Sequence, residues 1–94
     1  MKVYILIEEN SPELARECGG YNIIAVYKNY KEACAAALKQ AESHSAVDDY
    51  EIVDRFDERS KGEQIGYTLY LNGNEDSDCW FNVVVEPMAL PEQI

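Results

Sequence analysis

Four side chains with oxygen ligands alternate in one short segment and form the clearest candidate for a metal site. They are Asn72, Asn74, Asp76 and Asp78. In a calcium-binding loop, alternating ligands of this type wrap a hard cation, a glycine sits between the third and fourth, and a glutamate closes the loop. Ser77 occupies the glycine position here, and Val83 occupies the glutamate position. We therefore interpret the segment as a solvated hairpin connection, and predict no bound metal and no cofactor.

Side chains suited to nucleophilic catalysis are few and lie apart in the sequence. His44 is the single histidine, and we expect it at the surface near a helix end, where a positive charge is favourable. Cys18, Cys34 and Cys79 have no metal-binding spacing, and no local signature places one beside His44. We predict inert, mostly buried thiols and no enzymatic activity.

Charge is the most one-sided property of the chain. The formal net charge is -10 on 94 residues, and no Lys or Arg follows Lys61. Acidic residues continue through the last third as Glu63, Glu75, Asp76, Asp78, Glu86 and Glu92. A field of this size repels nucleic acid and anionic membranes and attracts basic surfaces. We therefore expect a basic protein as partner, without direct nucleic-acid binding and without a membrane.

The composition is that of one folded domain spanning residues 1–94. Apolar residues make up 47% of the chain, which is too many for a disordered acidic tail. The apolar run at residues 3–7 is followed at once by Glu8 and Glu9, so it is too short for a signal peptide or a membrane span. Together with the predicted reduced thiols, this favours a cytoplasmic protein.

The first half of the sequence predicts a strand, a short helix and a second strand. Both faces of residues 3–7 are apolar, so we expect this strand inside the sheet and near its centre. Ser11 followed by Pro12 and Glu13 is typical of a helix start, with Ser11 as N-cap, and Gly19 is typical of its end. Residues 21–28 are rich in β-branched and aromatic side chains and predict a strand antiparallel to the first.

A longer helix is predicted at residues 30–43. Asn29 is suited to cap it, with Glu32 three residues later. One apolar stripe recurs at helical spacing and is expected to face the sheet: Tyr30, Ala33, Cys34, Ala37, Leu38 and Ala41.

Three further strands are predicted at residues 50–56, 65–71 and 79–86, the last two as a hairpin. Pro87 is expected to end the last strand and leave a short flexible tail from about residue 88. The elements together predict an α+β fold: an antiparallel sheet of about five strands with one principal helix on one face. Because that helix covers one face only, some aromatic residues of the sheet should remain exposed on the other, from among Tyr4, Tyr27, Tyr70 and Trp80.

The opening M-K-V-Y-I-L-I and the later I-I-A-V-Y-K-N-Y-K-E-A, over about residues 1–57, resemble a group of small acidic α+β proteins of phages and mobile elements. In that group a strand similarly enters a capped helix. Ala25 stands here where a glycine is common, and Asn29 replaces the usual serine cap. The resemblance transfers no functional residue, and it implies an inhibitor that occupies the nucleic-acid site of a host protein.

The sequence therefore predicts a non-enzymatic acidic protein-binding module. It would mimic nucleic acid and block a basic nucleic-acid-binding site on a host protein, such as a CRISPR effector. The residues expected to contact the partner are Asp48, Asp49, Glu63, Glu75, Asp76, Asp78, Tyr70 and Trp80. The alternative is a small structural or regulatory homo-oligomer, such as a homodimer, that associates through an exposed aromatic sheet face.

Overall fold

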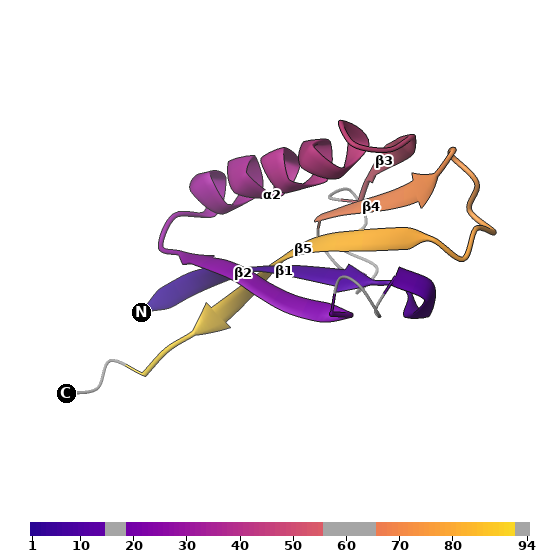
Figure 1. The fold of residues 1–94 in the computed structure, drawn as a ribbon. Coiled ribbons are helices and arrows are strands. Elements are labelled where there is room, and N and C mark those ends of the chain that lie inside the picture. The colour runs from indigo at the N-terminus through magenta and orange to yellow at the C-terminus, as the bar shows by residue number, and fades with distance from the viewer. Residues whose placement is uncertain (15–18, 56–65, 92–94) are drawn as a thin grey trace.

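The computed structural model of this chain describes residues 1–14, 19–55 and 66–91. Its elements follow the chain as β1 (Lys2–Asn10), β2 (Tyr21–Tyr27), α2 (Tyr30–Ser45), β3 (Tyr50–Asp54), β4 (Gly66–Leu71) and β5 (Trp80–Ala89) (Figure 1). A helical turn at residues 12–14 follows β1. The strands form one antiparallel sheet in the order β2-β1-β5-β4-β3. The predicted α+β fold and its order of elements are confirmed.

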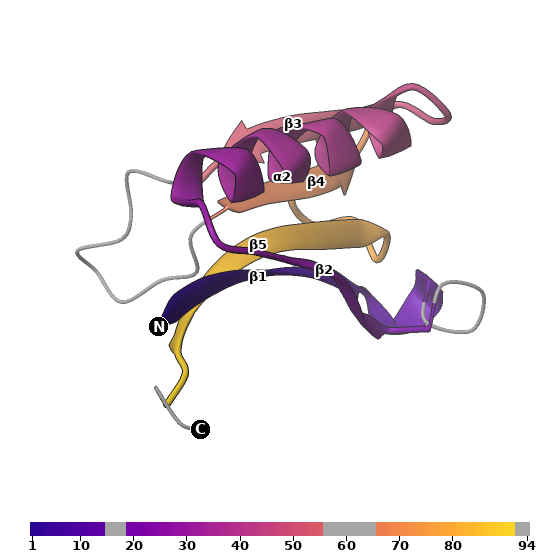
Figure 2. The ribbon, with the colours of Figure 1, turned by 90° about the vertical axis from the view of Figure 1, so that its left-hand side faces the viewer.

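Helix α2 lies across one face of the sheet and contacts all five strands (Figure 2). β1 lies inside the sheet, as its two apolar faces predict, but β5 and not β1 is the central strand. In the described part of the chain, β2 is the only strand on one side of β1, whereas β5, β4 and β3 lie on its other side. β5 is therefore the middle strand of the five. The antiparallel pairing of β1 with β2 is confirmed.

The start of α2 follows its local sequence. The side-chain oxygen of Asn29 accepts a hydrogen bond from the backbone N–H of Glu32 at 3.2 Å, which confirms the predicted N-cap. Three alanines at helical spacing are fully buried against the sheet: Ala33, Ala37 and Ala41. Leu38 is 39% exposed, so the buried stripe is narrower than predicted. Small side chains let the helix approach the sheet closely, and only the line of residues nearest the sheet is then enclosed.

Replacing Ala37 with leucine is expected to lower the free energy of unfolding by about 1–3 kcal/mol, because the larger side chain has no space between α2 and the sheet. Ala35 lies in the same helix but is exposed, so Ala35→Leu is a matched control that should leave stability almost unchanged. Urea denaturation of the two variants measures the difference. Equal midpoints for both would contradict the packing of α2 described above.

The prediction that Pro87 ends the last strand is wrong. β5 continues to Ala89, with Pro87 opposite Tyr4 of β1. Beyond Val84, β5 pairs with β1 alone among the described residues. A proline, which lacks an N–H, is tolerated where its nitrogen does not need a ladder partner. The pairing extends to Leu90, whose N–H donates to the carbonyl oxygen of Met1 at 2.6 Å.

Two smaller expectations also need correction. The Ser11 hydroxyl is buried and has no hydrogen-bond partner among the described residues, so it does not cap the helical turn in that part of the chain. The Ser11 carbonyl accepts from the N–H of Leu14. The third strand ends at Asp54, two residues earlier than predicted, and β4 begins at Gly66. Several residues used in the predictions lie outside the described residues: Cys18, Phe56, Glu63 and Ile65.

Candidate functional site

Two loops that are distant in sequence meet at one end of the sheet. The turn after α2 leads into Tyr50, which pairs with Leu71 at the end of β4. The N–H of Asn72 donates to the carbonyl oxygen of Asp49 at 2.5 Å, so the loop between β4 and β5 is joined directly to the turn before β3. This contact brings the predicted residues Asp48 and Asp49 to the same end as those of the β4–β5 loop.

The β4–β5 loop is held by its own side chains. Asn72 and Gly73 have φ angles of 56° and 69°, and the N–H of Asn74 donates to the carbonyl oxygen of Leu71 at 3.1 Å. The side-chain oxygen of Asn74 accepts from the N–H of Asp76 at 3.0 Å. One of the four alternating oxygen ligands is therefore engaged in the turn itself. Within the described ranges, no group of three or more His, Cys, Asp and Glu residues is arranged to hold a metal ion.

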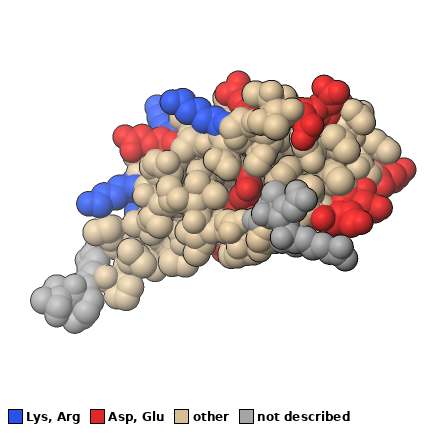
Figure 3. Space-filling view, in the orientation of Figure 1, with Lys and Arg blue, Asp and Glu red and all other residues tan. Residues whose placement is uncertain are grey.

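Exposed carboxylates gather at this end of the molecule, which we call the acidic end. Its members are Glu13, Asp48, Asp49, Glu51, Glu75, Asp76 and Asp78. On the face shown in Figure 3, Asp and Glu side chains crowd the end that carries the β4–β5 loop, whereas the visible Lys and Arg side chains lie toward the other end. No Lys or Arg in the described part of the chain forms an ion pair with a member of the acidic end. These negative charges are therefore open to a cationic partner.

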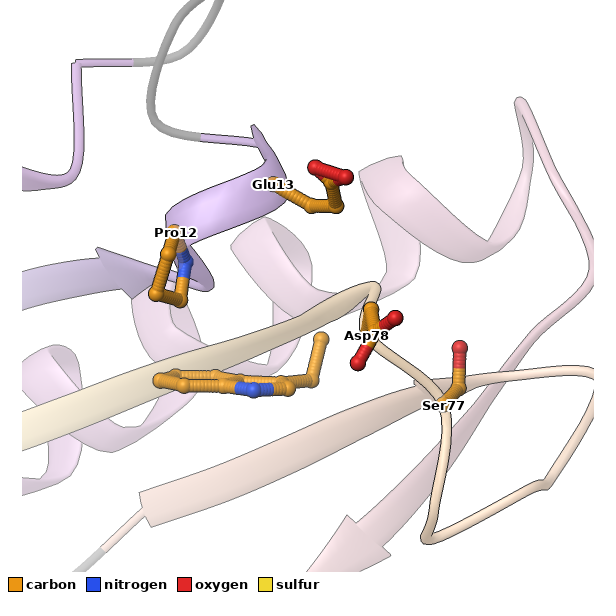
Figure 4. A pocket seen from close by; sticks show the side chains of 5 residues that line it. Pro12, Glu13, Ser77 and Asp78 are labelled. Carbon is orange, nitrogen blue, oxygen red and sulfur yellow. The ribbon is translucent and has the colours of Figure 1, made fainter.

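A pocket of about 350 Å³ opens within the acidic end. Pro12 and Glu13 reach it from the segment after β1, and Ser77 and Asp78 reach it from the loop before β5 (Figure 4). Trp80 completes the lining. The two segments are joined by a hydrogen bond from the N–H of Ser11 to the carbonyl oxygen of Trp80 at 3.0 Å. The pocket thus combines an indole surface with two carboxylates.

The two aromatic residues predicted to contact a partner are neighbours on the sheet. Tyr70 and Trp80 are directly opposite each other on β4 and β5, on the face away from α2, and both are half-buried. The Tyr70 hydroxyl accepts a hydrogen bond from the guanidinium of Arg55 at 3.1 Å. By contrast, Tyr4 and Tyr27 pack against the core beneath α2. Two of the four candidate aromatic residues therefore lie on the outer face.

His44 is not solvated at the surface as expected, although it lies in the last turn of α2. Its ring stacks on Phe81, with centroids 3.9 Å apart, and its Nε2 contacts the carboxylate of Glu8 on β1. Gln40 Nε2 donates to the same carboxylate oxygen at 3.0 Å. Burial raises the pKa of Glu8, but the hydrogen bonds from His44 and Gln40 and the charge of His44 outweigh burial, so this pKa lies below its ordinary value.

The cluster of Glu8, Gln40 and His44 joins α2 to the sheet. Glu8 is only 6% exposed and does not line the pocket at the acidic end. Its three side chains satisfy one another in the interior, as buried polar groups generally do. We therefore infer that this cluster stabilises the packing of α2 on the sheet. Cys34 and Cys79 are free thiols and half-buried, so they are less enclosed than predicted.

Comparison with known proteins identifies no relative. No protein-family model, curated protein or solved structure matches this chain. Among the described residues, no helix has the length and apolar character needed to cross a membrane. The charge and geometry of the acidic end are therefore the features from which a function can be inferred.

Sequence reasoning missed part of this end. Glu13 and Pro12 were assigned only to a helix start, and Glu51 only to a strand. The pairing of β1 with β5 would have revealed the first two, because it places the end of β1 beside the beginning of β5 and hence beside Trp80. Of the predicted contact residues, Glu63 lies outside the described residues, and the other seven lie on the loops or strands described above.

Proposed function

We propose that this chain is a non-enzymatic acidic protein-binding module whose acidic end occupies a basic, nucleic-acid-binding surface of another protein. The observation that carries the proposal is the gathering of exposed carboxylates from three separate segments at one end of the sheet, where no Lys or Arg of the described residues pairs with them. Carboxylates presented in this way can take the place of phosphates against Lys and Arg side chains. A host nucleic-acid-binding protein, such as a CRISPR effector, has a surface of this kind.

The pocket supplies a specific anchor for such a partner. A Lys or Arg side chain that enters it would meet the indole of Trp80 and the carboxylates of Glu13 and Asp78. A cation over an aromatic face gains about 0.5–2 kcal/mol, depending on how far it is desolvated. Hydrogen bonds between a guanidinium and carboxylates add geometric specificity. The pocket therefore favours one inserted cationic side chain, surrounded by weaker contacts with the loop carboxylates.

The chain contains a single tryptophan, so Trp80 fluorescence reports directly on this pocket. We expect titration with an oligo-arginine peptide to change the emission of Trp80 at low salt. Raising the ionic strength should weaken binding steeply, because the Debye length falls from about 10 Å at 0.1 M salt to about 3 Å at 1 M. An uncharged oligoglycine-serine peptide of equal length should leave the emission unchanged.

Neutralising one loop tests where the cation binds. The triple variant Glu75→Gln, Asp76→Asn, Asp78→Asn should weaken peptide binding about 10- to 100-fold, since each exposed ion pair contributes up to about 1 kcal/mol. Glu32→Gln, Glu42→Gln, Glu86→Gln is the matched control, because it removes the same charge from exposed positions outside the acidic end. If both triple variants bind equally weakly, total charge and not the acidic end determines binding, and the proposal is wrong.

The natural partner can be sought with the same pair of variants. The wild-type chain and each triple variant would be immobilised and exposed to host lysate at low salt, and retained proteins released at high salt. A nucleic-acid-binding protein retained by the wild type and by the control, lost by the loop variant, and displaced by DNA or RNA is the expected result. Retention that nucleic acid does not displace would contradict mimicry.

A further inference from the structure

The edge formed by β2 differs from the opposite edge of the sheet. β2 has seven residues, none of them charged and none of them proline. The other edge, β3, has five residues and carries Glu51 and Asp54. Short length and charged side chains are the usual protection of an edge strand against pairing with another chain. β3 is short and charged, whereas β2 is longer and uncharged.

The exposed side chains of β2 add an apolar surface to this edge. The register with β1 shifts between Leu6 and Ile7, which indicates a β-bulge in β2 at Ile24. Because the bulge interrupts the alternation, three apolar side chains of β2 fall on the same face, away from α2, where they lie opposite residues of β1. These are Tyr21, Ile23 and Val26, which are 56%, 62% and 58% exposed. Ile24 is itself 41% exposed.

The charges at the two ends of β2 have opposite signs. Lys28 directly follows β2, Lys31 lies at the start of α2 and Lys2 begins β1, so lysines surround the end of the strand. Its beginning lies beside Glu9, which pairs with Tyr21, and near the segment that carries Glu13, because the N–H of Asn10 donates to the carbonyl oxygen of Gly20. An antiparallel neighbour identical to β2 would set each lysine-bearing end beside an acidic end.

We propose that a second copy of this chain pairs its β2 antiparallel with this edge, which forms one sheet continuous through both copies. A two-fold axis makes the interface the same on each side, as is usual for homodimers. Exposed backbone groups of the two strands hydrogen-bond, and the apolar side chains of each copy cover those of the other. The bulge reduces the number of regular backbone hydrogen bonds that the two strands can form. The apolar side chains of Ile23 and Val26 therefore contribute a large part of the free energy of association.

This interface leaves the β4–β5 loop open. β1, β5 and β4 separate β2 from the turn before β3, and the loop lies at the far end of the β4–β5 hairpin. The dimer therefore presents two loops of the acidic end. Glu13 lies near both surfaces, but the β4–β5 loop serves only the binding of a basic partner and β2 serves only dimerisation. The loop variant and the β2 variant therefore test the two proposals separately.

Sedimentation velocity over a wide range of protein concentration tests the proposal. We expect the wild-type chain to shift from monomer to dimer as concentration rises. The double variant Ile23→Lys, Val26→Lys should remain monomeric and folded, because both positions are exposed. The matched control Leu38→Lys, Val47→Lys makes the same change of charge at two other exposed apolar positions and should still dimerise.

Amide hydrogen exchange identifies the strand involved. Those β2 amides that do not face β1 should become protected as concentration rises, by tenfold or more, whereas amides of the β3 edge should not. A monomer at every concentration would overturn the proposal. Equal dimerisation of the two double variants, or protection of β3 in place of β2, would also overturn it.

Discussion

Replacing Glu8 with alanine is expected to lower the free energy of unfolding by about 3 kcal/mol. The carboxylate of Glu8 is buried and receives hydrogen bonds from Gln40 and His44, both on α2. Its removal leaves those two groups without their partner and opens a small cavity between helix and sheet, and each of these effects is unfavourable. Urea denaturation at pH 7 measures the loss.

The matched control for this change is Glu86→Ala. Glu86 is an exposed residue of the same sheet, so its replacement should change stability by no more than about 0.5 kcal/mol. Glu8→Gln retains the shape of the side chain and a hydrogen-bond acceptor but loses the charge. Its free energy of unfolding should therefore lie between those of wild type and Glu8→Ala. Equal stability of Glu8→Ala and Glu86→Ala would show that the cluster does not hold α2 to the sheet.

The same carboxylate makes stability depend on pH. Because the folded-state pKa of Glu8 lies below its ordinary value of 4.5, ionised Glu8 stabilises the folded state. This contribution is fully present when the pH is above the ordinary pKa of 4.5, and it is lost as the pH falls through the lowered pKa of the folded state. The stability difference between wild type and Glu8→Gln should therefore shrink as the pH falls below about 4.5. A difference that grows on acidification would contradict the assignment.

Replacing Gly66 with alanine should have an effect of similar size, about 3 kcal/mol. Gly66 begins β4 opposite Val84, and an added Cβ would overlap the backbone carbonyl oxygen of Val83 and lie 2.9 Å from the Cα of Val84. Backbone atoms of the central strand cannot move aside without disturbing the pairing of β5 with both neighbours. Thermal or urea denaturation measures the loss.

Gly73→Ala is the control for Gly66→Ala, because it also replaces a glycine but brings the new Cβ against a side chain and not against backbone atoms. The new Cβ at Gly73 would meet the carboxylate of Glu51, the mobile end of an exposed side chain. The φ angle of 69° costs an alanine about 1–2 kcal/mol, so some destabilisation is expected at this position too. Gly66→Ala should nevertheless be the more damaging of the two. The reverse order would show that β4 can shift away from β5.

Local interactions explain why much of the fold could be predicted. Asn29 caps α2 through atoms three residues apart, and the turn at Asn72 and Gly73 uses residues tolerant of positive φ. Both depend on neighbours in the sequence, which the sequence displays directly. Runs of apolar, β-branched and aromatic residues likewise predicted the first two strands. The end of β5 was missed because Pro87 is normally a strand terminator, whereas its pairing with Tyr4 of β1, which is distant in the sequence, continues the strand to Ala89.

The candidate site depended more on tertiary structure. The sequence shows that Asp78 and Trp80 are close, but the contribution of Glu13 follows from the pairing of β1 with β5 across the sheet. His44 was misplaced for the same reason: its partner Glu8 is 36 residues away. From the sequence alone, a polar residue at a helix end is predicted to be exposed to solvent. A buried partner on the strand beneath the helix is found only when the tertiary structure is known.

Residue types and their spacing are sufficient to predict the order of the elements, the capped helix, the single-layer sheet with one covering helix, and the strongly negative charge. These features depend on residue type and on spacing along the chain. Only the tertiary structure decided that carboxylates from three segments gather at one end, that Glu8 and His44 are joined in the interior, and that a bulge turns three apolar side chains of β2 to one face. Each of these depends on strand order and register, because those set which distant residues become neighbours.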